Sequence, residues 1–403
     1  MLKKISTEHL RVGMHLHELC GSWMEHPFWR AKFTLTDEND VRKVRESGIT
    51  EVWIDVAKGD DVPDAKTPAQ VEQQVEAILQ QTVAREPAPK KVSLKEEVER
   101  AAQICAKSKD AVVSMFQEVR MGKAISAEAA GELVDEISSS VMRNPGALIS
   151  LARLKTADDY TYMHSVAVCA LMVALAGQLR LDEEQIRAAG MSGLLHDLGK
   201  AMMPMEVLNK PGKLTDEEFT IIKSHPVEGH RLLVEGGTVG EIPLDVCLHH
   251  HEKVDGTGYP HHLKGDEISL FAKMGAVCDV YDAITSNRPY KAGWDPAESI
   301  RKMTEWSKGH FDERIFQGFV KSIGIYPTGS LVRLTSGRLA VVVEQSEKSL
   351  LAPRIKAFFS TKSLTYVTPE LIDLSRPGTA EKIASREDAA KWGIKNIDQF
   401  WMA

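Results

Sequence analysis

The sequence has few cysteines, no excess of positive charge and no apolar run long enough to cross a membrane. Its five cysteines form no CxxC pair, which excludes a disulfide framework or a zinc knuckle and favours a reducing, cytoplasmic setting. The net charge of −7 argues against a general nucleic-acid binder, although a few local cations could still hold a small anion. The most apolar run, Val166 to Leu175, is shorter than the roughly 20 residues that span a bilayer, and the N-terminus has no signal-peptide core. We therefore expect no membrane span and a buried core helix at this run.

The length of 403 residues and an apolar content of 43% predict a globular protein of two or three domains. Helical periodicity dominates the middle of the chain, so the expected fold class is mainly α. Changes in composition divide the chain into a small N-terminal α/β domain at 1–60, a linker with a polar helix at 61–92, a helical domain at 93–326 and a C-terminal β-rich appendage at 327–403.

The N-terminal 60 residues alternate between strand and helix signals. Strands are expected at 12–19, 32–35 and 51–56, and a helix is expected from Thr36 to Ser47, where Gly48 follows. An aromatic cluster separates the first two strands. Its members are Trp23, His26, Phe28 and Trp29, next to Arg30. Core and loop packing is the simpler interpretation, and a sensory or protein-contact surface is the alternative.

Helix start signals recur after the linker. The linker itself carries a helix over 68–85, whose apolar stripe could pair with another helix. Ser93 and Thr215 each precede a glutamate by three residues, which predicts a capping box. One helix is expected over Asp182 to Gly199, with an apolar face that Asp197 continues inward. After residue 327, strands are expected at 330–334, 339–344 and 354–360.

Histidines and aspartates follow one another through the helical region in a pattern that points to metal binding. A lone histidine is more often a packing residue than a ligand, but here five imidazoles and two carboxylates fall on separate predicted helices. They are His164, His196, Asp197, His225, His250, His251 and Asp279. Metal coordination is one way to satisfy such buried polar groups.

The set is large enough for two metal ions. One ion could take His164, His196 and Asp279, and the other could take His225, His250 and His251. Asp197 could bridge the two, and a bridging water would act as the hydroxide nucleophile at neutral pH. The lack of cysteine ligands favours iron or manganese. His249 cannot face the same point as the next two histidines, so we expect it to lie outside the ligand set.

Four further residues are candidates for contacting an anionic substrate. Lys200 follows Asp197 by three residues and could hold a phosphate oxygen or help the leaving group, and its simpler role is a solvated lysine at a helix end. Arg288 and Lys291 offer phosphate contacts, and Tyr259 could touch a phosphate or a base. Each of these three could instead be a structural or surface residue.

At this point the sequence strongly resembles the HD-GYP family of cyclic di-GMP phosphodiesterases, a branch of the HD metal-dependent phosphohydrolases. Six motifs over about 150–325 carry the resemblance: His164-Ser, His196-Asp-Leu-Gly-Lys, Asn209-Lys-Pro-Gly-Lys-Leu-Thr, His225-Pro, His250-His-Glu-x-x-Asp-Gly-x-Gly-Tyr-Pro and Asp279-Val-Tyr-Asp-Ala-Ile-Thr-Ser-Asn-Arg-Pro-Tyr-Lys. Residues 1–60 more loosely resemble the uncharacterised domain that often precedes this domain in bacterial proteins.

The resemblance implies a helical HD-type domain that hydrolyses cyclic di-GMP to pGpG and, more slowly, to GMP. It implies that the seven residues above are the metal ligands and that Tyr259, Arg288 and Lys291 contact the substrate. Family members with three metals carry a glutamate one helical turn before the first ligand histidine, where this chain has Tyr160. We therefore predict a site for two ions and pGpG as the main product.

Two alternatives stay open from the sequence. The chain could bind cyclic di-GMP as a sensor or docking protein with negligible turnover, or it could hydrolyse another nucleotide such as cyclic GMP-AMP or a guanosine polyphosphate. The retained ligand set argues against the first alternative, and the Gly-Tyr-Pro loop argues against the polyphosphate. The candidate protein partners are a second copy of the chain, in a homodimer, and another signalling protein.

Overall fold

A computed structural model describes residues 1–21, 32–63, 65–82, 92–154, 160–208, 210, 212, 214–237, 239–287, 293–346 and 349–402. The chain divides into two compact units. The first contains Met1–Gln81 and Arg301–His310, and the second contains Thr82–Ile300 and Phe311–Ala403. The predicted C-terminal appendage therefore belongs to the same compact unit as the helical domain.

The first unit is built on a four-stranded antiparallel sheet with the strand order β1-β4-β2-β3. Its elements are β1 (Leu2–Ser6), the 3-10 turn η1 (Thr7–His9), β2 (His15–Cys20), β3 (Phe33–Thr34), α1 (Glu38–Glu46), β4 (Glu51–Asp55) and α2 (Pro68–Thr82). Leucine, isoleucine and valine side chains from the sheet and from α1 form one apolar core.

The sequence predicts most of this unit. The structure confirms β2, β3, α1 and β4 to within a few residues, and α2 begins at Pro68 as expected. The strand β1 was not predicted. The aromatic cluster around Trp29 and residues 83–91 of the linker lie outside the described residues. Val71, Val75 and Leu79 of α2 are buried within the chain, so this stripe is already covered.

The second unit is mainly helical, and the expected fold class is confirmed. Its helices are α3 (Leu94–Arg120), α4 (Ala127–Arg143), α5 (Pro145–Arg153), α6 (Tyr160–Gln178), α7 (Glu183–Leu195), η3 (Leu198–Met202), α8 (Met205–Leu208), α9 (Asp216–Lys223), α10 (His225–Gly236), α11 (Glu241–His249), η4 (Gly265–Glu267), α12 (Leu270–Thr285), α14 (Glu313–Ile323), η5 (Ala390–Trp392) and α15 (Gln399–Met402). Helix α13 (Pro296–His310) begins in this unit and ends in residues grouped with the first.

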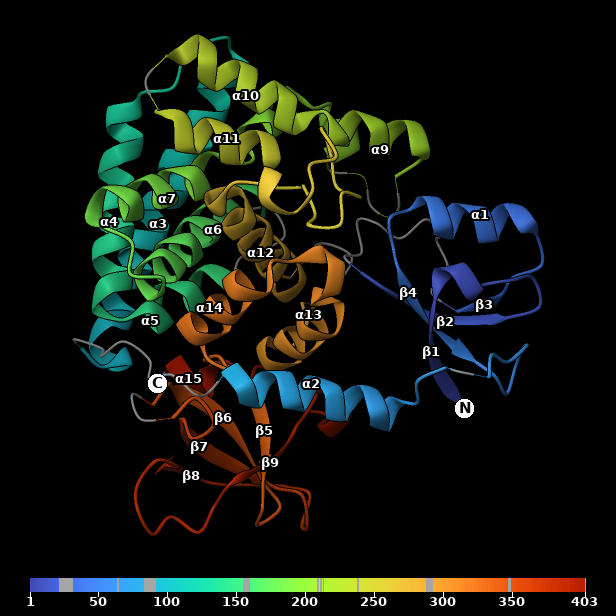
Figure 1. Cartoon of the computed structure of the whole chain (residues 1–403). Coiled ribbons are helices and arrows are strands. Elements are labelled where there is room, and N and C mark those ends of the chain that lie inside the picture. The colour runs from blue at the N-terminus through green and yellow to red at the C-terminus, as the bar shows by residue number, and fades with distance from the viewer. Residues whose placement is uncertain are drawn as a thin grey trace. The chain divides into compact units, whose positions relative to one another are not determined.

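Helix α6 is the centre of this unit (Figure 1). It lies against α3, α4, α5, α7, α12 and α14. The stretch Thr161–Gln178 is long and apolar enough to cross a membrane, but 78% of it is buried inside the protein. This burial confirms the core helix predicted at Val166 to Leu175, and it explains why the helix has no polar face.

Helix ends follow the local signals in the sequence, with one correction. The capping boxes at Ser93 and Thr215 are both present. Asp182 caps α7 as expected, but the helix ends at Leu195 rather than at Gly199. The chain then turns through the short helix η3, so His196 and Asp197 lie at a helix end and not within a regular helix.

The C-terminal part of the second unit is a five-stranded antiparallel sheet with the order β8-β7-β6-β5-β9. Its strands are β5 (Leu331–Leu334), β6 (Arg338–Glu344), β7 (Arg354–Ser360), β8 (Thr365–Asp373) and β9 (Ile383–Arg386). The first three strands are those predicted from the sequence. The two edge strands were missed, because β8 is mostly exposed and β9 is short.

Candidate metal centre

The structure brings the seven predicted ligand side chains together in the second unit. His164 comes from α6, His196 and Asp197 from the end of α7, His225 from the start of α10, His250 and His251 from the end of α11, and Asp279 from α12. All seven are at least nine-tenths buried. Their donor atoms fall into two groups that could each hold a metal ion.

Two glycines allow these helices to approach closely. A Cβ atom on Gly193 of α7 would lie 2.8 Å from backbone atoms of Cys169 in α6. A Cβ atom on Gly199 would lie only 1.9 Å from the carbonyl oxygen of His225. Any larger residue at either position would separate elements that carry the candidate ligands.

The first group contains His164, His196 and Asp279. Nε2 of His164 lies 2.9 Å from Oδ1 of Asp279, and Nε2 of His196 lies 4.0 Å from the same oxygen. The two Nε2 atoms are 3.3 Å apart. Three nitrogen and oxygen donors therefore point at one small volume.

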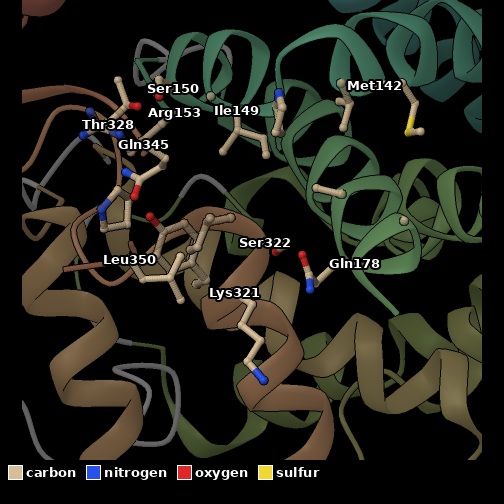
Figure 2. Close-up of a pocket in the computed structure, with 18 of the residues that line it drawn as sticks. Met142, Ile149, Ser150, Arg153, Gln178, Lys321, Ser322, Thr328, Gln345 and Leu350 are labelled. Atoms are coloured by element: carbon tan, nitrogen blue, oxygen red, sulfur yellow. The ribbon is translucent and has the colours of Figure 1, made fainter. Parts of the chain in front are cut away.

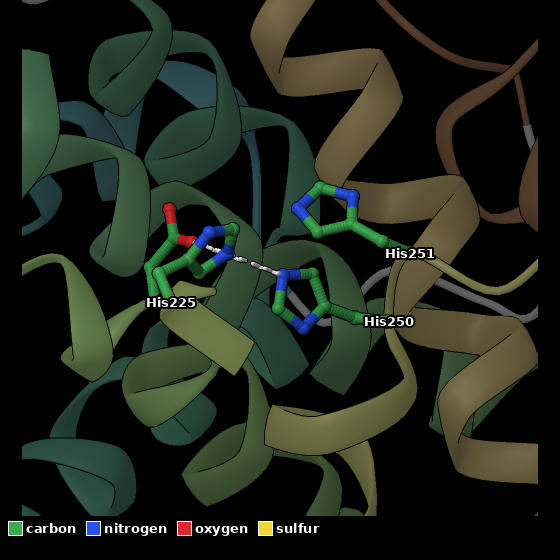
Figure 3. Close-up of side chains that lie close together, drawn as sticks. His225, His250 and His251 are labelled. Atoms are coloured by element: carbon green, nitrogen blue, oxygen red, sulfur yellow. Dashed lines mark hydrogen bonds and ion pairs between the residues drawn. The ribbon is translucent and has the colours of Figure 1, made fainter. Parts of the chain in front are cut away.

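The second group contains Asp197, His225, His250 and His251. Figure 3 shows the imidazoles of His225 and His250 turned toward each other, with that of His251 beside them; the Nε2 atoms of the first two are 3.3 Å apart. Nε2 of His225 lies 3.1 Å from Oδ1 of Asp197. This group again combines imidazole nitrogens with one carboxylate.

Asp197 connects the two groups through its two oxygen atoms. Its Oδ2 lies 3.4 Å from Nε2 of both His164 and His196. Its Oδ1 lies 3.1 Å from Nε2 of His225 and 3.8 Å from that of His250. The carboxylate is fully buried, and its two oxygens face different groups of imidazoles.

The imidazoles are held in the tautomer that leaves Nε2 available for a metal. In His196, His225 and His250, Nδ1 lies 2.7 to 3.1 Å from backbone carbonyl oxygens of the preceding turn. In His164, Nδ1 lies 2.6 Å from Oδ2 of Asp282. A proton on Nδ1 leaves a lone pair on Nε2, and two such lone pairs 3.3 Å apart repel each other. A cation between them removes this repulsion, so the residues fit a metal ion.

Two buried atoms of the site also lack hydrogen bonds. Oδ1 of Asp197 and Nε2 of His251 are buried and make none to the described residues. Leaving such atoms unsatisfied is costly, and coordination to a cation would satisfy both. These two orphaned atoms both belong to the second group.

The charges around the site favour a positive ion. Burial opposes ionisation of Asp197, but the ammonium group of Lys200 outweighs it and holds the pKa of this carboxyl well below its usual range. The pKa of Asp279 also lies well below its usual range despite burial, so both carboxylates are anionic. Burial lowers the pKa of His250 to about 3, so this imidazole is neutral at pH 7 and can act as a ligand.

The predicted substrate contacts have different positions relative to the centre. Nζ of Lys200 pairs with Oδ2 of Asp197. The ring of Tyr259 stacks on His251, with 4.7 Å between ring centroids and 24° between planes. Arg288 and Lys291 lie outside the described residues. His249 is not in either group, in line with the sequence, and its Nδ1 lies 2.8 Å from Asp245.

Two residues near the centre were not assigned a role from the sequence. Asp282 holds His164, and it follows Asp279 by three residues on α12, a spacing that could have identified it. Glu252 accepts hydrogen bonds from the backbone N–H groups of His261 and Leu263, at 2.7 and 3.1 Å. It thereby closes the loop that carries Tyr259, and no local sequence signal predicts this long-range contact.

Comparison with known proteins places these helices in a family. An HD domain model, from a metal-dependent family, matches residues 141–315, and a model described as a domain of unknown function (DUF3391) matches residues 2–130. The second match confirms the expected N-terminal resemblance and extends it into α4. The metal dependence expected from the sequence is therefore confirmed at the level of the family.

Three curated relatives are informative. A cyclic di-GMP phosphodiesterase of Pseudomonas aeruginosa is 54% identical over 402 residues, which cover 100% of this chain and 96% of the relative. The cyclic di-GMP phosphodiesterase response regulator RpfG of Xanthomonas campestris is 42% identical over 43% of this chain and 47% of its own length. A 3'3'-cGAMP-specific phosphodiesterase of Vibrio cholerae is 37% identical over 41% of this chain and 38% of its own length. A 54% identity along the whole chain, joined to an HD domain match over these helices, means that this chain belongs to the HD-GYP family of metal-dependent phosphodiesterases.

Proposed function

We propose that this protein hydrolyses cyclic di-GMP to pGpG at the candidate metal centre. The observation that carries the proposal is the convergence of seven buried His and Asp side chains in two groups, with Asp197 spanning both. The proposal is supported by the relative of Pseudomonas aeruginosa, which is matched along the whole chain and is named a cyclic di-GMP phosphodiesterase.

We propose two divalent ions as cofactors. His164, His196 and Asp279 would hold one ion, the second group would hold the other, and Asp197 would contact both. When bound, such ions lower the pKa of water and stabilise negative charge on a phosphate. A donor set of imidazoles and carboxylates without thiolate favours iron or manganese.

The chain's own residues would position the phosphodiester. Lys200 is tied to the buried carboxylate of Asp197, so its ammonium group is fixed at the edge of the centre, where it could donate a hydrogen bond to a phosphate oxygen. Tyr259 stacks on His251 and would offer its ring edge and hydroxyl group to the substrate. Arg288 and Lys291 complete the proposed contacts on the basis of their positions in the family motif.

We propose pGpG as the main product and not GMP. The position one turn before His164 is Tyr160, which lacks the carboxylate that a third ion would require. The proposed setting is the cytoplasm, which fits five cysteines that form no disulfide in the described residues.

The test is a turnover assay on anaerobically purified protein loaded with manganese or iron, with the metal content counted on the same sample. The expected result is two ions per chain and accumulation of pGpG from cyclic di-GMP, separated by chromatography. Cyclic GMP-AMP should be assayed in parallel, because one relative is named for it. Preferential cleavage of cyclic GMP-AMP would contradict the proposed substrate, and tight binding of intact cyclic di-GMP without turnover would indicate a sensor.

A further inference from the structure

A pocket separate from the candidate metal centre lies in the second unit, between its helices and its C-terminal sheet (Figure 2). Its walls come from α4, α5, α6, α12 and α14 and from the loops before β5 and after β6. Its volume is about 150 Å³, similar to a cavity that binds one benzene molecule. None of the candidate metal ligands lines it.

One end of the pocket is polar, and the other, apolar end is lined largely by apolar side chains, with Gln178 among them. Figure 2 shows Arg153, Thr328 and Gln345 together on one side and Met142 on the other, with Ile149 between them. A ligand with one polar group and an apolar body would match this arrangement.

The lining of the pocket is positively charged. Among the described residues that line the pocket, Arg153 and Lys321 are cationic and none is acidic, although the whole chain has a net charge of −7. The charge of the lining therefore complements an anion rather than a cation.

Arg153 carries most of the argument. Its side chain is only 13% exposed, and Nη2 of its guanidinium group is buried without a hydrogen bond to the described residues. The nearest carboxylate oxygen is Oδ1 of Asp398, at 3.6 Å, and this oxygen already accepts a hydrogen bond from Nε1 of Trp401 at 2.8 Å. A guanidinium group with five donors and no acceptor is poorly satisfied by such a contact.

Tyr281 and Thr328, which each carry a hydroxyl group, line the same pocket and are buried. One bound anion could accept hydrogen bonds from these hydroxyl groups and from Arg153. Tyr281 lies on α12 between Asp279 and Asp282, so a ligand here would contact the helix that carries two carboxylates of the candidate metal centre.

We propose that this pocket binds a small aromatic monocarboxylate, whose carboxylate is held by Arg153 and whose ring fills the apolar end. A planar guanidinium group matches a carboxylate in geometry as well as in charge. A volume of about 150 Å³ accepts a single ring and excludes a nucleotide. This site is separate from the proposed phosphodiesterase site and does not depend on it.

The test is a titration of the full-length, metal-loaded protein with benzoate, followed by ligand-observed NMR. Benzamide, which has the same shape and no charge, is the matched ligand control. Saturable benzoate binding is expected with a Kd of about a millimolar, the range open to so small a ligand. Benzamide should bind at least about tenfold more weakly, because it lacks the charge that Arg153 complements.

Four variants locate the binding. Arg153→Met should remove the preference for benzoate, whereas Arg376→Met, which changes an arginine that is 79% exposed, should retain it. Ala174→Leu should weaken both ligands by filling the pocket from α6. Asp398→Asn should tighten benzoate binding, because it removes the carboxylate that now lies nearest to Arg153.

The opposite results would overturn the proposal. If wild-type protein shows no saturable binding of benzoate up to about 20 mM, well above the expected Kd, the pocket does not bind this class. If Arg153→Met binds benzoate as wild type does, the carboxylate binds elsewhere, for example at the metal centre. Thermal unfolding of each variant shows whether it is folded. If Arg153→Met is unfolded, Ala174→Leu still tests whether benzoate binds in this pocket.

Discussion

Nδ1 of His164 lies 2.6 Å from Oδ2 of Asp282, and both side chains are buried. This contact fixes the proton on Nδ1 and turns Nε2 toward Asp279 and Asp197. Oδ1 of Asp282 in turn accepts a hydrogen bond from Oγ of Ser286 at 3.1 Å. A chain of contacts along α12 therefore orients the first candidate ligand.

Asp282→Ala should lower metal affinity and turnover by about 10- to 100-fold, the usual effect of removing a residue that orients a histidine ligand. Ser286→Ala removes only the contact behind Asp282 and should have a smaller effect. The measurements are metal content by mass spectrometry and turnover at saturating manganese. Unchanged metal affinity in the folded Asp282→Ala variant would mean that the contact does not orient His164.

Gly199→Ala should destabilise the protein by more than about 2 kcal/mol, because a Cβ atom would lie 1.9 Å from the carbonyl oxygen of His225. The displacement would also move His225 and reduce metal binding in the second group. Gly236→Ala is the matched control, since a Cβ atom there meets nothing within 4 Å at the end of α10.

The control variant should be neutral or more stable by up to about 1 kcal/mol, because alanine favours the helix more than glycine does. Chemical denaturation of both variants provides the measurement. Equal free energies of unfolding for the two variants would show that Gly199 is not needed for the close approach.

Local signals explain which parts of the fold could be predicted. The capped starts of α3 and α9 and the strand β7 are encoded within a few neighbouring residues. The strand β1 is not encoded in this way. A lysine in the sequence predicts an exposed position, but Lys4 is buried, where it pairs with the distant residues Glu51 and Glu305. The strand β8 contains Pro369, and its pairing with β7 depends on distant residues.

The candidate site also combines features that the local sequence predicts with features that depend on distant residues. Histidine and aspartate are recognisable as metal ligands by residue type, so all seven could be proposed from the sequence. The position of Asp197 between the two groups depends on both of its oxygens facing imidazoles from other helices, and Glu252 contacts a loop about ten residues away. Such roles can be assigned only from the folded chain. The role of Asp282 is an exception, because its spacing of three residues from Asp279 places both on one face of a helix.

Asp295 makes stability depend on pH in a predictable direction. Burial raises the pKa of this carboxyl to about 6, against the opposing effect of hydrogen bonds from the backbone of Leu331, Glu298 and Ala297. Since the folded state holds its proton more tightly than the unfolded state, the contribution of Asp295 to stability is present below about pH 4 and is lost as pH rises to about 6. The loss amounts to about 3 kcal/mol at most.

Asp295→Asn should remove this slope. The measurement is the free energy of unfolding at several pH values between about 4 and 7, expressed as the difference between variant and wild type. Taking this difference removes the contribution of the other carboxyl groups to the pH dependence, since they titrate in the same range in both proteins. If the difference does not change with pH, Asp295 is not protonated in the folded protein near pH 5.

Asp197→Asn tests the bridge directly. The amide group keeps the size of the side chain but offers one weaker oxygen donor and removes the negative charge between the two groups. We expect loss of turnover and loss of most bound metal, with the fold retained. The matched control is His249→Ala, since His249 is adjacent to His250 in the chain but bonds Asp245 instead.

The control variant should keep its metal content near that of wild type. Metal counting and cyclic di-GMP turnover on the same samples distinguish the two positions. If Asp197→Asn retains two ions and turns over substrate, the two groups hold their ions independently and Asp197 is not a bridge. If His249→Ala loses one ion, the second group includes His249, and the choice of His250 and His251 as the ligand pair is wrong.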